Sequence, residues 1–143
     1  MQVERTFTVS RPVEVVFDYL ADFTHTEEWD PGTVRTSRTS GDGGLGTTYA
    51  NTSQFMGRTS DLTYETTALE RPNRLEFRGH NDSVDTVDSM TFRAVGDVTE
   101  VHYRADFHFG RILSLIAPLV VRPKLEKLAD DTVVQMQRAI DRI

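Results

Sequence analysis

One carboxylate, Asp88, falls among apolar residues in a segment that alternates like a β-strand. Met90 and Phe92 share its predicted face. An ionised carboxylate is costly to bury unless it is paired, so the pKa of such a group tends to rise. Two interpretations stay open. Asp88 reaches solvent near the end of its strand, as most carboxylates do, or it is a functional carboxyl group paired with Arg58 or Arg93.

Three tyrosines on other predicted strands could direct hydroxyl groups into the same interior. Alternation points Tyr49, Tyr64 and Tyr103 inward, and a buried tyrosine hydroxyl usually finds a hydrogen-bond partner. That partner is either a structural group of the protein or a ligand oxygen. A hydroxyl within about 3 Å of a reacting atom could also act as a general acid. If the protein is an enzyme, the candidate catalytic residues are therefore Tyr64, Asp88, Tyr103 and Arg93.

The four histidines do not form a pattern typical of a metal site. His102 and His108 lie six residues apart on the polar face of one predicted strand, which separates them by about 20 Å. His25 and His80 fall in predicted loops, and the sequence has neither cysteine nor an HExxH motif. We therefore expect no metal and no cofactor. The glycine-rich segment 40–46 lacks the flanking strand and helix of a phosphate-binding loop, which favours a hairpin connection.

The residues after Lys124 predict one long amphipathic helix. Apolar residues recur there at intervals of mostly three and four, which places them on one face, while Glu126, Lys127 and Asp130 lie on the other. A helix of about 20 residues extends roughly 30 Å, so its apolar stripe needs a broad partner surface. The stripe comprises Leu125, Leu128, Ala129, Val133, Met136, Ile140 and Ile143.

Alternating segments before this helix predict a sheet that could supply that surface. Residues Gln2–Val9 form a first strand, and Ser10 could cap a short helix that ends near Ala21. A second short helix is expected within Asp22–Asp30. Six further strands, joined by short turns that favour antiparallel neighbours, are predicted at Val34–Thr39, Thr47–Phe55, Arg58–Leu69, Arg74–Gly79, Val84–Val95 and Thr99–Phe109.

Three motifs in this order of elements resemble the START-like, Bet v 1-like (SRPBCC) superfamily, and within it the polyketide cyclase/dehydrase group. They are VSRPVEVVFDYLAD at residues 9–22, EWDPG at 28–32 and LERPNRLEF at 69–77. The resemblance covers residues 1–143 and implies a single α+β domain with the helix-grip fold. In that fold a curved antiparallel sheet, here of about seven strands, wraps around a long C-terminal helix, and two short helices follow the first strand.

The resemblance also implies a cavity between the sheet and the helix, because members of this superfamily include binders of apolar small molecules. Such pockets are mostly apolar with a few oriented polar groups. Trp29, in the second motif, is expected either in the core or at the pocket mouth. Alternation assigns the lining to Tyr49, Asn51, Phe55, Leu62, Tyr64, Phe77, Asp88, Met90, Phe92, Tyr103, Phe107, Leu125 and Leu128.

Composition restricts the partners and the compartment. Of the 143 residues, 38% are hydrophobic and 27% charged, and a net charge of −6 without a basic run argues against nucleic acid as a partner. No apolar run is long enough to span a membrane, and the N-terminus lacks the pattern of a signal peptide. The absence of cysteine fits a reducing compartment. We therefore expect a cytoplasmic protein without an integral membrane segment.

Three functions are compatible with the sequence. The first, which we favour, is binding of a hydrophobic small molecule, such as a lipid, an isoprenoid or a polyketide-like compound, in the internal cavity. The second is a polyketide cyclase or dehydratase. The third is a module that contacts another protein, or a second copy of the chain in a homodimer, through the apolar segment 112–121. Pro118 and Pro123 predict a kinked helix or a lid around that segment.

Overall fold

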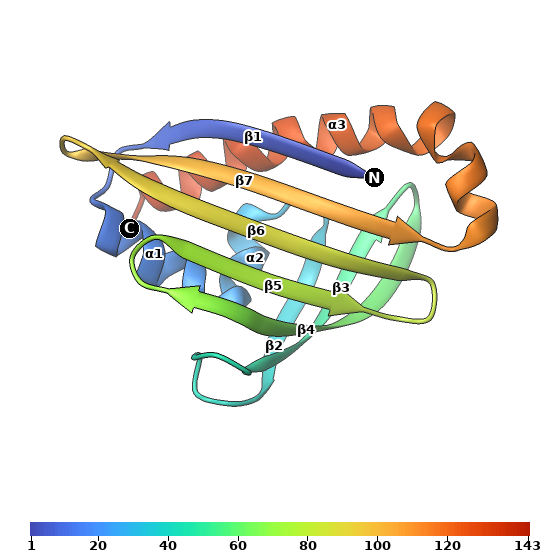
Figure 1. Ribbon diagram of the computed structural model, residues 1–143, viewed down its shortest axis with the longest axis horizontal. Coiled ribbons are helices and arrows are strands. Elements are labelled where there is room, and N and C mark those ends of the chain that lie inside the picture. The colour runs from blue at the N-terminus through green and yellow to red at the C-terminus, as the bar shows by residue number, and fades with distance from the viewer.

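The computed structural model consists of one antiparallel sheet, short helices after the first strand and a long C-terminal helix (Figure 1). It describes the backbone of residues 1–143 and the side chains of all residues except 111–118. The elements are β1 (Gln2–Val9), α1 (Val13–Ala21), η1 (Phe23–His25), α2 (Thr26–Trp29), β2 (Thr33–Ser40), β3 (Thr48–Phe55), β4 (Arg58–Glu70), β5 (Arg74–His80), β6 (Val84–Val95), β7 (Val98–Phe109) and α3 (Arg111–Asp141).

The sheet is a meander from β2 to β7 to which β1 is added at one edge. Its seven strands follow the order β1-β7-β6-β5-β4-β3-β2, and every neighbouring pair is antiparallel. Register shifts interrupt the pairing of β2 with β3 and of β4 with β5. Such irregularities bend strands and increase their twist, so the sheet curves and presents a concave face. The predicted helix-grip architecture is confirmed.

Helix α3 runs along the β1 side of this concave face and also contacts α2 (Figure 1). Polar contacts fix its orientation against β1. The Arg5 guanidinium donates hydrogen bonds to the carboxylates of Glu126 at 2.8 Å and Asp130 at 2.9 Å. Further along the helix, the Gln137 amide donates to the backbone carbonyl of Thr8 at 3.1 Å. Because these contacts are spread over several turns, they hold the helix axis parallel to the sheet edge.

The buried stripe of α3 follows the predicted periodicity over most of its length. Leu125, Ala129 and Ile140 are no more than 3% exposed. Some positions differ from expectation, among them Ala139, which is 3% exposed although it is absent from the predicted stripe. Thr132, which is polar and absent from the predicted stripe, is only 4% exposed, whereas Ile143 is 47% exposed because it lies beyond the end of the helix.

The start of α1 differs locally from the sequence prediction. The sequence predicts Ser10 as the cap of this helix, but Pro12 occupies the N-cap position and no side chain caps the first turn. Ser10 instead donates its backbone N–H to the Asp141 carboxylate at 2.9 Å. The end of α3 therefore holds the loop between β1 and α1, an interaction between distant residues that a local pattern does not reveal.

The kink or lid predicted around Pro118 lies outside the residues whose side chains the structure describes, as does most of the apolar segment 112–121. In the remainder of that segment, Leu119 is 85% exposed and Val121 is 1% exposed. The role proposed for this segment in contacts with other proteins stays a prediction.

Candidate functional site

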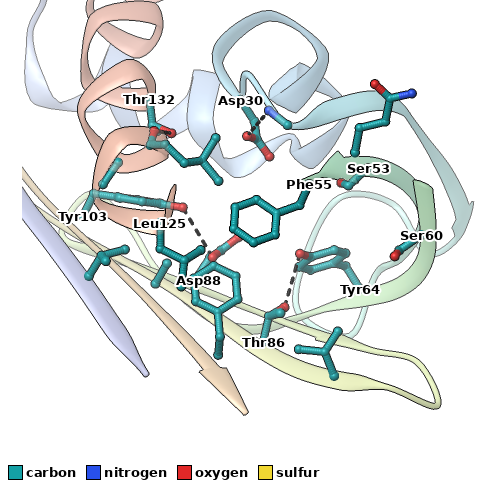
Figure 2. A pocket seen from close by; sticks show the side chains of 18 of the residues that line it. Asp30, Ser53, Phe55, Ser60, Tyr64, Thr86, Asp88, Tyr103, Leu125 and Thr132 are labelled. Carbon is teal, nitrogen blue, oxygen red and sulfur yellow. Dashed lines mark hydrogen bonds between the residues drawn. The ribbon is translucent and has the colours of Figure 1, made fainter. Parts of the chain in front are cut away.

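A cavity of about 160 Å³ lies between α3 and the adjoining parts of β3, β4, β6 and β7. Hydrocarbon and aromatic groups form most of its walls, and a few carboxyl and hydroxyl groups project into it (Figure 2). The lining residues are Val3, Asp30, Gly32, Ser53, Gln54, Phe55, Ser60, Tyr64, Val84, Thr86, Asp88, Tyr103, Ala105, Phe107, Phe109, Leu125, Leu128, Ala129 and Thr132.

Asp88 on β6 is the central polar group of the cavity. Its side chain is on the concave face, opposite Ala105 of β7, and the residue is 8% exposed. The Tyr103 hydroxyl donates to Asp88 Oδ1 across 3.4 Å, which is long for an O–H···O hydrogen bond. Burial, and secondarily the charge of Asp30, raise the pKa of Asp88 to about 7 despite this bond. Asp88 therefore changes its charge near neutral pH instead of reaching solvent as an ordinary carboxylate.

A second carboxylate, Asp30, faces the cavity from the end of α2 (Figure 2). It accepts hydrogen bonds from the Gly32 backbone N–H and the Thr33 hydroxyl, both at 2.9 Å. Burial raises the pKa of Asp30 although these two bonds oppose the shift. Sequence reasoning missed this residue because it treated the EWDPG motif as scaffold, and only the fold brings Asp30 toward Asp88.

Tyr64 on β4 and Thr86 on β6 meet across the strand between them. The Thr86 hydroxyl donates to the Tyr64 hydroxyl at 3.2 Å, and Gly79 of β5 is the register partner of both residues. A Cβ at Gly79 would lie 2.6 Å from the Tyr64 ring and from Thr86 Oγ1. A glycine inside a strand often marks such a close approach, a signal the sequence contained. Burial, followed by the charge of Asp88, raises the pKa of Tyr64.

Tyr103 connects the cavity to the core. Burial and the charges of Asp88 and Asp30 raise its pKa well above the ordinary value for tyrosine, so its hydroxyl stays protonated and donates. The ring of Trp29 packs edge-on against the Tyr103 ring at 6.1 Å between centroids. Trp29 is 1% exposed and does not line the cavity, which matches the expectation of a core residue.

Helix α3 closes the cavity with small and apolar residues. Leu125, Leu128 and Ala129 face it, together with Thr132, whose hydroxyl donates to the backbone carbonyl of Leu128 at 2.8 Å. That bond satisfies the hydroxyl within the helix, so Thr132 can occupy an apolar stripe. Val133, which the sequence assigns to the stripe, is only partly buried.

Six of the predicted lining residues do not border the cavity, and aromatic rings of the short helices cover three of them. Phe23 of η1 packs against Tyr49, Tyr64 and Phe77, with ring centroids 4.5–5.6 Å apart. Phe17 of α1 packs edge-on against Phe92 at 6.0 Å. The six residues are Tyr49, Asn51, Leu62, Phe77, Met90 and Phe92, all buried.

The other seven predicted residues border the cavity, and their contact with a ligand stays a prediction. They are Phe55, Tyr64, Asp88, Tyr103, Phe107, Leu125 and Leu128. Asn51, one of the six residues outside the cavity, has a structural partner, since its amide donates to the Thr36 hydroxyl at 2.8 Å.

Arg93, a catalytic candidate from the sequence, lies on the opposite face of the sheet from Asp88. It is exposed and pairs with Glu100 of β7 at 3.1 Å, and Arg58 is also exposed and outside the cavity lining. Strand residues five apart point to opposite faces, so neither the alternation nor the structure pairs Asp88 with Arg93. The cavity lining contains no lysine, arginine or histidine among the side chains described.

The histidines are separate from the cavity and from one another. His102 pairs with Glu4 at 2.9 Å and His80 pairs with Asp85 at 2.5 Å, whereas His25 Nδ1 is 2.6 Å from the backbone carbonyl of Tyr19. Within the described residues, no three histidine or carboxylate side chains converge as ligands of a metal ion. The same part of the chain contains no helix with both the length and the hydropathy of a membrane-spanning segment.

Solved structures of low sequence identity share the fold. The protein TTHA0849 of Thermus thermophilus superposes with a TM-score of 0.83 at 13% identity over 98% of this chain and 97% of that one. The Zhui aromatase/cyclase of Streptomyces sp. R1128 gives 0.75 at 18% identity over 99% and 92%. A START superfamily protein of Mycobacterium smegmatis gives 0.71 at 15% identity over 99% and 94%.

The sequence itself matches a family over nearly its whole length. No curated protein matches it, but residues 1–141 match the family described as polyketide cyclase / dehydrase and lipid transport. That match agrees with the three motifs and with the helix-grip fold. The chain therefore belongs to the polyketide cyclase/dehydrase and lipid transport family of the START-like, Bet v 1-like superfamily.

Proposed function

We propose that the protein binds a compact hydrophobic molecule, of aromatic or polyketide type, in the cavity under α3. The observation that carries this proposal is an internal space of about 160 Å³ with mostly apolar walls and a few oriented polar groups. That combination is typical of small-molecule sites. A protein interior is otherwise packed to the density of an organic crystal, so a space of this size beside the core leaves room for a small guest.

The volume favours a ring compound over a long acyl chain. An apolar cavity of about 150 Å³ admits benzene, and the space here is of similar size. Phe55, Tyr64 and Phe107 supply aromatic surfaces on the sheet side, and Leu125 and Leu128 supply aliphatic surface on the helix side. A ligand with one or two rings and one polar substituent would satisfy both the walls and the central hydroxyl and carboxyl groups.

A dehydratase or cyclase is the second candidate, because Asp88 has a pKa of about 7 and could exchange protons near neutral pH. In the dehydration of a β-hydroxy carbonyl compound, Asp88 would protonate the hydroxyl that leaves as water, and the Asp30 carboxylate would accept the α-proton. We favour binding because the described lining holds no cation to stabilise the enolate formed in such a step. If this second candidate were correct, replacing the proton donor in Asp88→Asn would abolish turnover without abolishing binding.

The single tryptophan offers a direct test of binding. Trp29 is the only tryptophan in the sequence and contacts Tyr103 at the cavity wall, so its fluorescence should change when the cavity fills. We expect titration with benzyl alcohol to give a saturable change with a stoichiometry of one.

The matched control fills the cavity from the helix side. Ala129 borders the cavity and is 3% exposed, so Ala129→Leu should place its side chain in the ligand space and weaken binding at least tenfold. The absence of a saturable signal in the wild type, or equal binding by the Ala129→Leu variant, would contradict the proposal.

A further inference from the structure

We propose that the cavity selects a hydrophobic amine in its protonated form, because Asp30 and Asp88 face an aromatic-walled space whose described lining holds no cationic side chain. This inference rests on the proposed binding function and adds the charge of the ligand to it. The ammonium group would lie between the two carboxylates, and the apolar part of the ligand would occupy the space under α3.

Asp88 is incompletely satisfied by the protein. An ionised carboxylate has about four acceptor positions, whereas the described part of the chain offers Asp88 a single hydrogen bond, from Tyr103 at 3.4 Å. The residue is nevertheless more than nine-tenths buried, with 8% exposure, and it lines the cavity (Figure 2). A buried carboxylate without a charged partner is unfavourable. An ammonium ion in the cavity would supply both the missing donors and the missing positive charge.

Among the side chains that the structure describes, the cationic groups on the surrounding elements are paired elsewhere or lie outside the cavity. Arg5 of β1 pairs with Glu126 and Asp130 of α3, and Lys127 of α3 pairs with Asp131. Lys124, on the same helix, is exposed.

The sheet behind Asp88 does not supply a cation to the cavity either. Arg104 of β7 pairs on the outer face with Asp106 at 2.9 Å, and Asp106 itself raises the pKa of Asp88 slightly. Among the described side chains, the charged groups that face the cavity are therefore Asp30 and Asp88.

The aromatic walls favour the same ligand. Phe55, Tyr64, Tyr103 and Phe107 line the space, and ring faces attract organic cations, more strongly when water is excluded. A carboxylate ligand would instead bring a third negative charge into the site. A neutral ligand would bind next to protonated Asp88, so only the amine gains from ionisation of that residue.

The ionisation of Asp88 links the affinity for an amine to pH. Asp88 has a pKa of about 7, and the amine pairs with its ionised form. Below pH 7 binding must release a proton, so affinity for the amine should increase as pH rises to about 8 and then level off. Affinity for a neutral ligand should change little or fall over the same range.

Three probes of similar size separate charge from shape: benzylamine, benzyl alcohol and benzoate. We expect calorimetric titration at pH 8 to show benzylamine binding at least tenfold more tightly than the other two. Raising the pH from 5.5 to 8 should tighten benzylamine binding at least fivefold without tightening benzyl alcohol binding. Equal affinities of the wild type for benzylamine and benzyl alcohol at pH 8, or no increase with pH, would overturn the inference and leave the proposed binding function standing.

Two matched variants test whether Asp88 causes the preference for the amine. Asp88→Asn should reduce the preference for benzylamine over benzyl alcohol to less than threefold while keeping benzyl alcohol binding. Asp85→Asn removes the same charge from the same strand, but Asp85 is exposed and pairs with His80, so the preference should persist. If Asp88→Asn still preferred benzylamine over benzyl alcohol as strongly as the wild type does, the inference would be overturned. If that variant does not fold, the pH series on the wild type alone tests the inference. If the wild type binds none of the three probes, the proposed function and the inference are both overturned.

Discussion

The concave face of the sheet has a filled half and a hollow half, and the same strands run through both. In the filled half, Phe77, Met90 and Phe92 are packed under α1 and η1. In the hollow half, Asp88 and Tyr103 border the cavity under α3. Strand β6 changes from one half to the other between Asp88 and Met90, which are two residues apart and on the same face.

The difference lies in what covers the sheet. Large rings from the short helices, above all Phe23 and Phe17, fill one half. Over the other half α3 contributes small residues, Ala129 and Thr132, beside its leucines. Asp88, Tyr64 and Tyr103 border the half where the covering element leaves room, whereas the inward Tyr49 is packed against Phe23 in the filled half. Packing from outside the sheet therefore decides which inward residues can meet a ligand.

The largest expected effect comes from removing an aromatic ring in each half. Phe77 is 0% exposed in the filled half, so Phe77→Ala should lower the free energy of unfolding by about 3–5 kcal/mol. Phe107 is only partly buried beside the cavity, so Phe107→Ala should cost less than about 1.5 kcal/mol. Urea unfolding of both variants measures the difference, and equal losses would show that the two halves are packed alike.

The second effect concerns the charge in the hollow half. The pKa of Asp88 is about 7 in the folded protein and about 3.9 in an unfolded chain. Because the folded state holds the proton more tightly, this group's contribution to stability falls as pH rises from about 4 through 7. Asp88→Asn removes that dependence.

The gain in stability from Asp88→Asn should therefore grow by about 2–3 kcal/mol between pH 5 and pH 8.5. Urea unfolding at the two pH values measures it, with Asp85→Asn on the exposed face as the control. Parallel pH profiles for the wild type and Asp88→Asn would show that Asp88 is an ordinary solvated carboxylate.

A third comparison makes the same change at two positions of α3. Ala139 is 3% exposed and belongs to the packed core, so Ala139→Leu should destabilise the protein by about 1–3 kcal/mol through overpacking. Ala129 is equally buried but borders the cavity, so Ala129→Leu should change stability by less than about 0.5 kcal/mol. Thermal unfolding measures the stability of both variants. If Ala129→Leu destabilised the protein more than Ala139→Leu, the cavity would lie under the other end of the helix.

The smallest effect is expected on the outer face of the sheet. Arg93 is exposed and pairs with Glu100, and such surface ion pairs contribute little. Arg93→Ala should alter stability by less than about 0.5 kcal/mol and the affinity for benzyl alcohol by less than twofold. A loss of benzyl alcohol binding in Arg93→Ala would mean that the outer face of the sheet is energetically coupled to the cavity.

Much of the fold could be predicted because local patterns determine it. Alternation located all the strands, and the spacing of apolar residues after Lys124 located the regular part of α3. The cap of α1 could not be predicted in this way. Ser10 bonds to Asp141 at the far end of the chain instead of capping the helix, and a local pattern carries no information on such a contact.

The site could be predicted only in part. Alternation identified Asp88 and Tyr103 as inward residues, but it assigned Phe77 and Met90 to the same lining because it cannot show what covers each part of a sheet. Asp30 was missed because its place in the cavity depends on how α2 packs against α3.

The central claim is that the hollow half takes a small hydrophobic guest, and a crystal soaked in 4-bromobenzyl alcohol tests it most directly. We predict a bromine anomalous peak within the space bounded by Tyr64, Asp88, Tyr103 and Leu125, and its loss in Ala129→Leu. Crystals in which that space is filled by the protein's own side chains, with no bromine peak inside it, would contradict the account.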